Sequence, residues 1–236
     1  MDKYTIHDTL KKYKTDLEEK GYLVFAVTLK GSQNYNLDDD KSDIDAVAVI
    51  LPEPHKLTIK TPGKEYVYPE GIVTVMDIFA FSKSMFRGHP NFLELAHSKY
   101  IVGDKDGLSY FRQFKVNPKV VHGLVINKNQ EVKKLLNKKL LSEEQMIKIC
   151  KNIHHIARLT IASDNLIYFE GKTRNYLMSI KRNFDFAVKE YHEHINSWCS
   201  LTQSNITNNF TQTETDWKYI DSIYLTNLEK KNVMTF

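Results

Sequence analysis

The chain has 236 residues, of which 42% are hydrophobic and 26% charged, and its net charge is +4. This length can bury a core in one domain or in two small ones, and the composition is ordinary for a soluble globular protein. No apolar stretch approaches the ~20 residues of a membrane span, and residues 1–14 have no apolar core of a signal peptide. The mild positive charge permits an anionic partner, such as a nucleotide or RNA, without requiring one.

Cysteine usage points to a reducing compartment. Cys150 and Cys199 are the two cysteines, and they have no CxxC spacing. We therefore expect two free thiols in a cytoplasmic protein that has no membrane partner.

The first third of the chain predicts a helix followed by strands. Residues 7–20 form an amphipathic pattern that Gly21 can end. Three apolar runs rich in β-branched and aromatic residues then predict strands at 22–29, 44–51 and 72–79. The segment between the second and third runs is rich in Pro, Gly and charge, and we expect a loop there that can hold a hairpin.

Beyond the third strand the pattern becomes helical. Ser142 and Gln145 match a capping box, which places a helix start between them. The residues that follow the last expected helix, 200–216, are polar and predict a loop. Helices are expected at 82–87, 90–98, 104–113, 128–140, 142–169 and 174–198. We therefore predict an α+β fold. Residues 1–120 would form a domain with a small mixed β-sheet and flanking helices, and residues 121–236 a helical domain.

A dense aspartate run, Asp38 to Asp45, precedes and enters the second expected strand. Asp43 and Asp45 are two residues apart, so in a strand their side chains point to the same face. Like charges on one face repel, and hard carboxylate oxygens suit Mg²⁺ or Mn²⁺, so a cation between them is one interpretation; a solvated strand end is the other. Asp38, Asp39 and Asp40 are consecutive in a loop and are expected to be solvated.

A third carboxylate is predicted on the next strand. If the second and third strands are neighbours, Asp77 can join Asp43 and Asp45. A cluster of three carboxylates can hold two metal ions for in-line phosphoryl displacement. Upstream, Gly31 and Ser32 directly follow a buried strand, where backbone N–H groups and a hydroxyl can bind phosphate oxygens.

The segments GSQNYNL, SDIDAVAV and VMDIF together resemble the nucleotidyltransferase signature of the DNA polymerase β superfamily. Within it, the chain is most similar to the bacterial and phage predicted nucleotidyltransferases, whose pattern is Gly-Ser-x-x-Tyr-Gly-Leu and then Ser-Asp-x-Asp. Asn36 stands where that family usually has Gly, and Asn also tolerates a left-handed φ. Similarity continues through HPNFLELAHS and KNIHHIARL and covers roughly residues 25–195. The matched positions are Gly31, Ser32, Tyr35, Leu37, Ser42, Asp43 and Asp45.

The resemblance implies transfer of a nucleoside monophosphate from an NTP such as ATP, with release of pyrophosphate. Asp43, Asp45 and Asp77 would ligate two Mg²⁺ or Mn²⁺ ions, and Gly31 and Ser32 would bind the phosphates. The acceptor, an RNA or tRNA end, a protein hydroxyl or a small molecule, has no readable signature, nor has the oligomeric state. Two alternatives stay open: a non-catalytic nucleotide- or RNA-binding module of the same fold, and a toxin or defence component with the same chemistry.

Basic residues in the helical half extend this hypothesis. Lys151, His155 and Arg158 fall at i, i+4 and i+7, so they share one helix face that could meet the triphosphate. The alternative is a solvated basic face. Glu94 is expected to be structural, and the Lys-rich face of 128–139 is expected to be solvated rather than bound to RNA.

Overall fold

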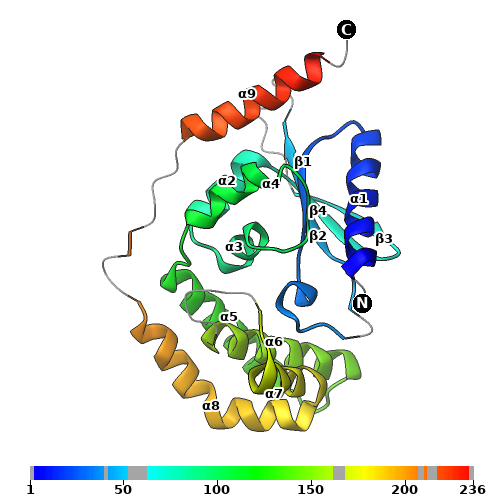
Figure 1. The fold of residues 1–236 in the computed structure, drawn as a ribbon. Coiled ribbons are helices and arrows are strands. Elements are labelled where there is room, and N and C mark those ends of the chain that lie inside the picture. The colour runs from blue at the N-terminus through cyan, green and yellow to red at the C-terminus, as the bar shows by residue number, and fades with distance from the viewer. Residues whose placement is uncertain are drawn as a thin grey trace. The chain divides into compact units, whose positions relative to one another are not determined.

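The computed structural model describes residues 3–39, 42–52, 63–161, 168–206, 210–211 and 217–233, and its fold is α+β (Figure 1). The chain divides into two compact units. The first consists of Met1–Lys115 and Gln212–Phe236, and the second of Val116–Thr211. The division after Lys115 lies close to the expected boundary at 120. The C-terminal segment, however, belongs to the first unit and not to the helical one.

A mixed five-stranded sheet with the order β3-β4-β2-β1-β5 is the centre of the first unit. β2 is antiparallel to β1 and parallel to β4, β3 forms a hairpin with β4, and β5 adds to the other edge. The three expected strands are confirmed, and the third ends where α2 begins. The bounds are β1 Leu23–Leu29, β2 Ala46–Leu51, β3 Lys64–Tyr68, β4 Gly71–Asp77 and β5 Ile101–Gly103.

One face of this sheet is covered by α1 (Lys3–Glu19) (Figure 1). The helix buries an apolar stripe at helical spacing against the strands, as its sequence pattern predicted. The core residues are Ile6, Leu10, Tyr13 and Leu17 of α1 with Ala46, Ala48, Ile50, Val73 and Val75 of the strands. Alternate residues of β2 and β4 therefore face α1, and the residues between them face the opposite side.

The opposite face is covered by helices that follow β4 (Figure 1). Thr28 of β1 donates to the main-chain O of Leu95 at 2.9 Å, and Tyr224 donates to the main-chain O of Pro52 at 2.7 Å. Within the described ranges, no helix is long and apolar enough to cross a membrane. The elements are α2 Ile78–Phe86, α3 Pro90–Ala96, α4 Lys105–Ser109, the 3₁₀ turn η3 Tyr110–Gln113 and α9 Trp217–Val233.

The second unit is helical: α5 Pro118–Leu136, α6 Glu143–Ile161, α7 Gly171–Arg182 and α8 Phe184–Ser204. The capping box is confirmed, since Gln145 N donates to Ser142 Oγ and Ser142 N to Gln145 Oε1, both at 3.3 Å. Both cysteines are free thiols, as predicted, and burial raises the pKa of each.

Several helix boundaries differ from the sequence prediction, and the largest differences are in the second unit. α5 begins ten residues earlier than expected, at a proline preceded by the cap Asn117. The helix expected over 174–198 is two helices, because Asn183 leaves the helical conformation and accepts from Phe186 N at 3.0 Å. α8 extends to Ser204 into the expected loop, while residues 162–167, in the expected end of the 142–169 helix, lie outside the described residues.

Candidate functional site

The Gly-Ser turn and the Ser-Asp-x-Asp segment lie together at one end of the sheet. β1 leads into the turn and β2 begins after Asp45, and the two strands pair with Leu29 opposite Ala46. Lys30 N donates to the main-chain O of Asp45 at 2.8 Å, and Ser32 Oγ donates to Ser42 Oγ at 3.3 Å. The structure therefore brings the two halves of the sequence motif side by side.

The turn depends on two residues with positive φ. Gly31 has a φ of 91° and Asn36 has a φ of 61° in the left-handed region, on either side of the 3₁₀ turn η1 (Ser32–Tyr35). A Cβ on Gly31 would meet nothing within 4 Å, so backbone conformation, and not space, calls for glycine. Asn36 adopts the conformation that the glycine of the resembling family would allow, so the expected tolerance is confirmed.

Buried hydrogen bonds fix this turn to α3. The hydroxyl of Tyr35 donates to the carboxylate of Glu94, and Asn34 Nδ2 donates to the main-chain O of Glu94 at 3.2 Å. Gln33 Nε2 also donates to the main-chain O of Ser42 at 3.2 Å. Glu94 is only 1% exposed, which fits the structural role expected for it.

Asp39 is not a solvated bystander, contrary to the sequence expectation. Its side chain accepts from Ser42 Oγ at 3.0 Å, and its main-chain N donates back to that oxygen at 2.9 Å. Asp39 therefore orients the serine that precedes the Asp-x-Asp pair. Asp38 is half-buried, and Asp40 lies outside the described residues.

Asp43 is exposed and Asp45 is half-buried directly before β2. One oxygen of Asp45 accepts from the main-chain N of Ile72, at the start of β4, at 3.0 Å. The phenol of Tyr13 donates to the main-chain O of Ile44, between the two aspartates, at 3.2 Å. Burial raises the pKa of Tyr13, and the negative charges of Glu70, Asp45 and Asp43 raise it further. The charges of these three carboxylates therefore disfavour ionisation of Tyr13.

The structure does not bring Asp77 to this site. β2 and β4 are parallel, and Asp77 pairs with Ile50, whereas Ala46 pairs with Val73. Asp77 thus lies about 16 Å along the strands from the level of Asp45, at the other end of the sheet. Its carboxylate accepts from Ala80 N at 2.7 Å and caps α2. The predicted cluster of Asp43, Asp45 and Asp77 is therefore corrected, and Asp77 is a helix cap.

The strand position beside Asp45 is occupied by Ile72, which is 39% exposed. A third carboxylate, Glu70, lies in the turn just before β4, and its main-chain O accepts from Ile44 N at 2.7 Å. Its Oε1 pairs with Lys12 Nζ at 2.6 Å, which lowers the pKa of Glu70. Its Oε2 is buried, with no hydrogen-bond partner among the described residues. Sequence reasoning missed Glu70 because it lies in a segment that was assigned to a loop.

The basic stripe belongs to α6 of the second unit. Lys151 is exposed, His155 is half-buried and Arg158 is only 4% exposed, so the stripe is not a uniformly solvated face. His154 points elsewhere: its Nδ1 donates to the main-chain O of Leu177 at 2.9 Å, and burial lowers its pKa to about 4. The role of the stripe toward a triphosphate stays a prediction.

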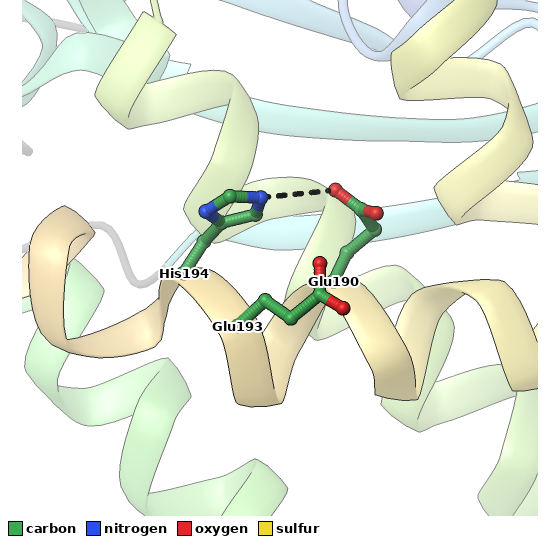
Figure 2. Close-up of side chains that lie close together, drawn as sticks. All are labelled: Glu190, Glu193 and His194. Atoms are coloured by element: carbon green, nitrogen blue, oxygen red, sulfur yellow. Dashed lines mark ion pairs between the residues drawn. The ribbon is translucent and has the colours of Figure 1, made fainter.

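A separate cluster on α8 has the spacing of a metal site (Figure 2). Ligand atoms of Glu190, Glu193 and His194 lie within 4.8 Å of one another, and the described residues contain no other such group of three. Glu190 is already engaged, since it accepts from the Tyr176 hydroxyl at 2.7 Å and pairs with His194 Nε2 at 3.4 Å. Metal binding there would compete with both contacts.

Chemically, the first unit combines backbone N–H groups and a hydroxyl with neighbouring carboxylates, a set that suits a phosphate ester and a hard divalent cation. Comparison of the chain with protein-family models and with curated proteins finds no match.

Proposed function

We propose that the protein is a metal-dependent nucleotidyltransferase that transfers a nucleoside monophosphate from an NTP to an acceptor and releases pyrophosphate. The observation that carries the proposal is the placement of Gly31 and Ser32 directly beside the Asp43–Asp45 segment, joined by the Ser32–Ser42 contact of 3.3 Å. Phosphoryl transfer needs mainly positioning and neutralisation of charge. The turn would supply the positioning, and divalent cations held by the acidic residues would supply the neutralisation.

Gly31 and Ser32 would hold the triphosphate. Glycine lets phosphate oxygens approach the backbone closely, and the N–H groups of the turn and the Ser32 hydroxyl are the donors that such oxygens accept from. The bonds of Tyr35 and Asn34 to Glu94 fix the turn before the nucleotide binds. Backbone donors fixed in this way need no reordering during the reaction, whereas the Ser32 hydroxyl would turn from Ser42 toward the phosphate.

The carboxylates at this end of the sheet fit a magnesium or manganese ion. Asp43 and Asp45 offer hard oxygen ligands, and Mg²⁺ is commonly bound by one or two carboxylates together with substrate phosphates. Such an ion would neutralise charge on the triphosphate. Glu70 is the candidate for a third ligand, because its buried Oε2 has no hydrogen-bond partner among the described residues. A second ion would require Glu70 to turn from Lys12 toward the aspartates.

A second candidate function is nucleotide binding without transfer. One observation favours it: the position on β4 beside Asp45 is Ile72, and the carboxylate expected on that strand, Asp77, caps a helix at the other end. A site with two carboxylates can still hold a metal–nucleotide complex, but it has fewer groups to activate an acceptor.

Turnover of labelled NTPs separates the two functions. The full chain is incubated with Mg²⁺ or Mn²⁺, each α-labelled NTP and total RNA, tRNA or protein, and both pyrophosphate and labelled acceptor are measured. We expect transfer by the wild type and a loss of about 10²-fold or more in Asp43→Asn with Asp45→Asn. Asp106→Asn, an exposed acid of α4, is the matched control and should keep full activity.

Two results would count against this proposal, one against transfer and one against the assigned metal ligands. Metal-dependent NTP binding without pyrophosphate release under any condition would select the binding module. Release that is undiminished in the double aspartate variant would show that these residues are not the metal ligands.

A further inference from the structure

A groove on the second unit is lined by residues that none of the above chemistry uses. It runs along α7 to the start of α8 and has a volume of about 450 Å³. Arg174 and Arg182 lie in its lining with Asn175 and Ser179 between them along the helix, and Phe186 adds an aromatic ring. Met178, which is buried, also contributes to the lining.

The charge of this region is mainly positive, although Glu170 precedes α7 and Asp185 lies in the first turn of α8. α7 contains two lysines and two arginines and no acidic residue. The second unit, Val116–Thr211, has 14 Lys and Arg against 8 Asp and Glu, a net charge of +6, whereas the whole chain has +4. The first unit therefore carries a net charge of −2. The groove is thus a basic surface on the basic unit, complementary to a polyanion.

The spacing of the two arginines favours a polymer with several phosphate groups over a single phosphate. Arg174 and Arg182 are eight residues apart on one helix, which separates their backbones by about 12 Å. That span is larger than one phosphate group and covers more than one nucleotide of a chain. Guanidinium groups bind phosphate oxygens in a planar, bidentate manner, so each can hold a different phosphate.

The uncharged residues of the groove suit the bases of a single-stranded nucleic acid. Phe186 is half-buried, and its ring meets Tyr176 edge-on at 6.2 Å between centroids. Aromatic rings in basic grooves stack unpaired bases with little preference for sequence. Asn175 and Ser179 are exposed polar groups between the two arginines, where they can reach base edges or the sugar.

We infer that this groove binds single-stranded nucleic acid. A use of the groove to hold the acceptor of nucleotidyl transfer rests on the proposed function. Binding itself does not, because neither the Gly31–Ser32 turn nor the Asp43–Asp45 segment takes part. The two ideas can therefore fail separately.

The test is binding of labelled oligo(U) RNA and oligo(dT) DNA of about 12 nucleotides, without metal or NTP, over a series of salt concentrations. We expect Arg174→Gln with Arg182→Gln to weaken binding about tenfold or more, and to reduce the log–log salt slope by about 1.4. Lys138→Gln with Lys139→Gln removes the same charge from exposed positions of the same unit and should change affinity little. Tighter binding of one oligonucleotide would identify RNA or DNA as the ligand.

A second variant protects the test against misfolding. Ser179→Asp places a negative charge in the groove at an exposed helix position and should also weaken binding. The inference is overturned if the wild type binds neither oligonucleotide, if the arginine and Ser179 variants bind as the wild type does, or if the lysine control loses as much affinity. If Asp43→Asn with Asp45→Asn lacks transfer but still binds the oligonucleotides, this result would support nucleic-acid binding in the groove independently of catalysis.

Discussion

At the scale of single residues, Asn36 is the only non-glycine residue with positive φ in the described ranges. It ends the turn that positions Ser32 beside Ser42. A left-handed conformation costs most L-residues about 1–2 kcal/mol, and Asn is among the few that adopt it routinely.

Substitutions of Asn36 should follow this backbone requirement. We expect Asn36→Gly to leave the free energy of unfolding nearly unchanged, and Asn36→Val to lower it by about 1–2 kcal/mol. Urea unfolding measures both, with Asn36→Asp as a control that keeps tolerance for this conformation. A valine variant as stable as the wild type would show that the turn is not held in this conformation.

His154 should make the stability of the protein depend on pH. A histidine in the unfolded chain has a pKa of about 6.5, whereas burial lowers the pKa of His154 in the folded chain to about 4. Its contribution is therefore complete above the unfolded pKa and falls as the pH drops, by about 2 kcal/mol between pH 7 and pH 5. Urea unfolding of His154→Gln at pH 7 and pH 5 should therefore show a decrease in the free energy of unfolding that is smaller by about 2 kcal/mol than in the wild type. The same loss in both proteins would contradict the buried, neutral imidazole.

At the scale of elements, strand direction decides which carboxylates meet. Apolar runs rich in β-branched and aromatic residues correctly predicted β1, β2 and β4. The antiparallel β1–β2 pair brings Gly31 and Ser32 to Asp43 and Asp45. Hydrophobic pattern does not encode whether neighbouring strands are parallel, so the end at which Asp77 lies could not be predicted. A continuous helical pattern likewise concealed the cap at Asn183 that separates α7 from α8.

Asp77 should behave as a helix cap and not as a metal ligand. We expect Asp77→Ala to lower the free energy of unfolding by about 1 kcal/mol, because Ala80 N loses its acceptor. Asp77→Asn keeps a capping oxygen and should cost less. Calorimetry should find the same Mn²⁺ and nucleotide affinity in both variants as in the wild type. A large loss of metal affinity in Asp77→Asn would instead support the sequence-based prediction that Asp43, Asp45 and Asp77 bind metal together.

At the scale of the whole molecule, the chain separates into two units with opposite net charge. The change from strand to helix pattern predicted a boundary within a few residues of Lys115. The return of α9 to the first unit was not predictable, because it depends on contacts between distant segments, such as Tyr224 with Pro52. In the proposed function, metal and triphosphate would bind to the first unit, whereas the basic groove belongs to the second.

The most direct test of this account is calorimetric titration of the full chain with each Mn²⁺–nucleoside triphosphate. The wild type should bind at least one of them, and Asp43→Asn with Asp45→Asn should lose about tenfold or more in affinity. Glu193→Gln with His194→Gln removes the competing cluster on α8 and should leave nucleotide affinity unchanged. Undiminished nucleotide affinity in the double aspartate variant would contradict the proposal that the nucleotide binds beside Gly31, Ser32, Asp43 and Asp45. A loss of nucleotide affinity only in the α8 variant would contradict it as well.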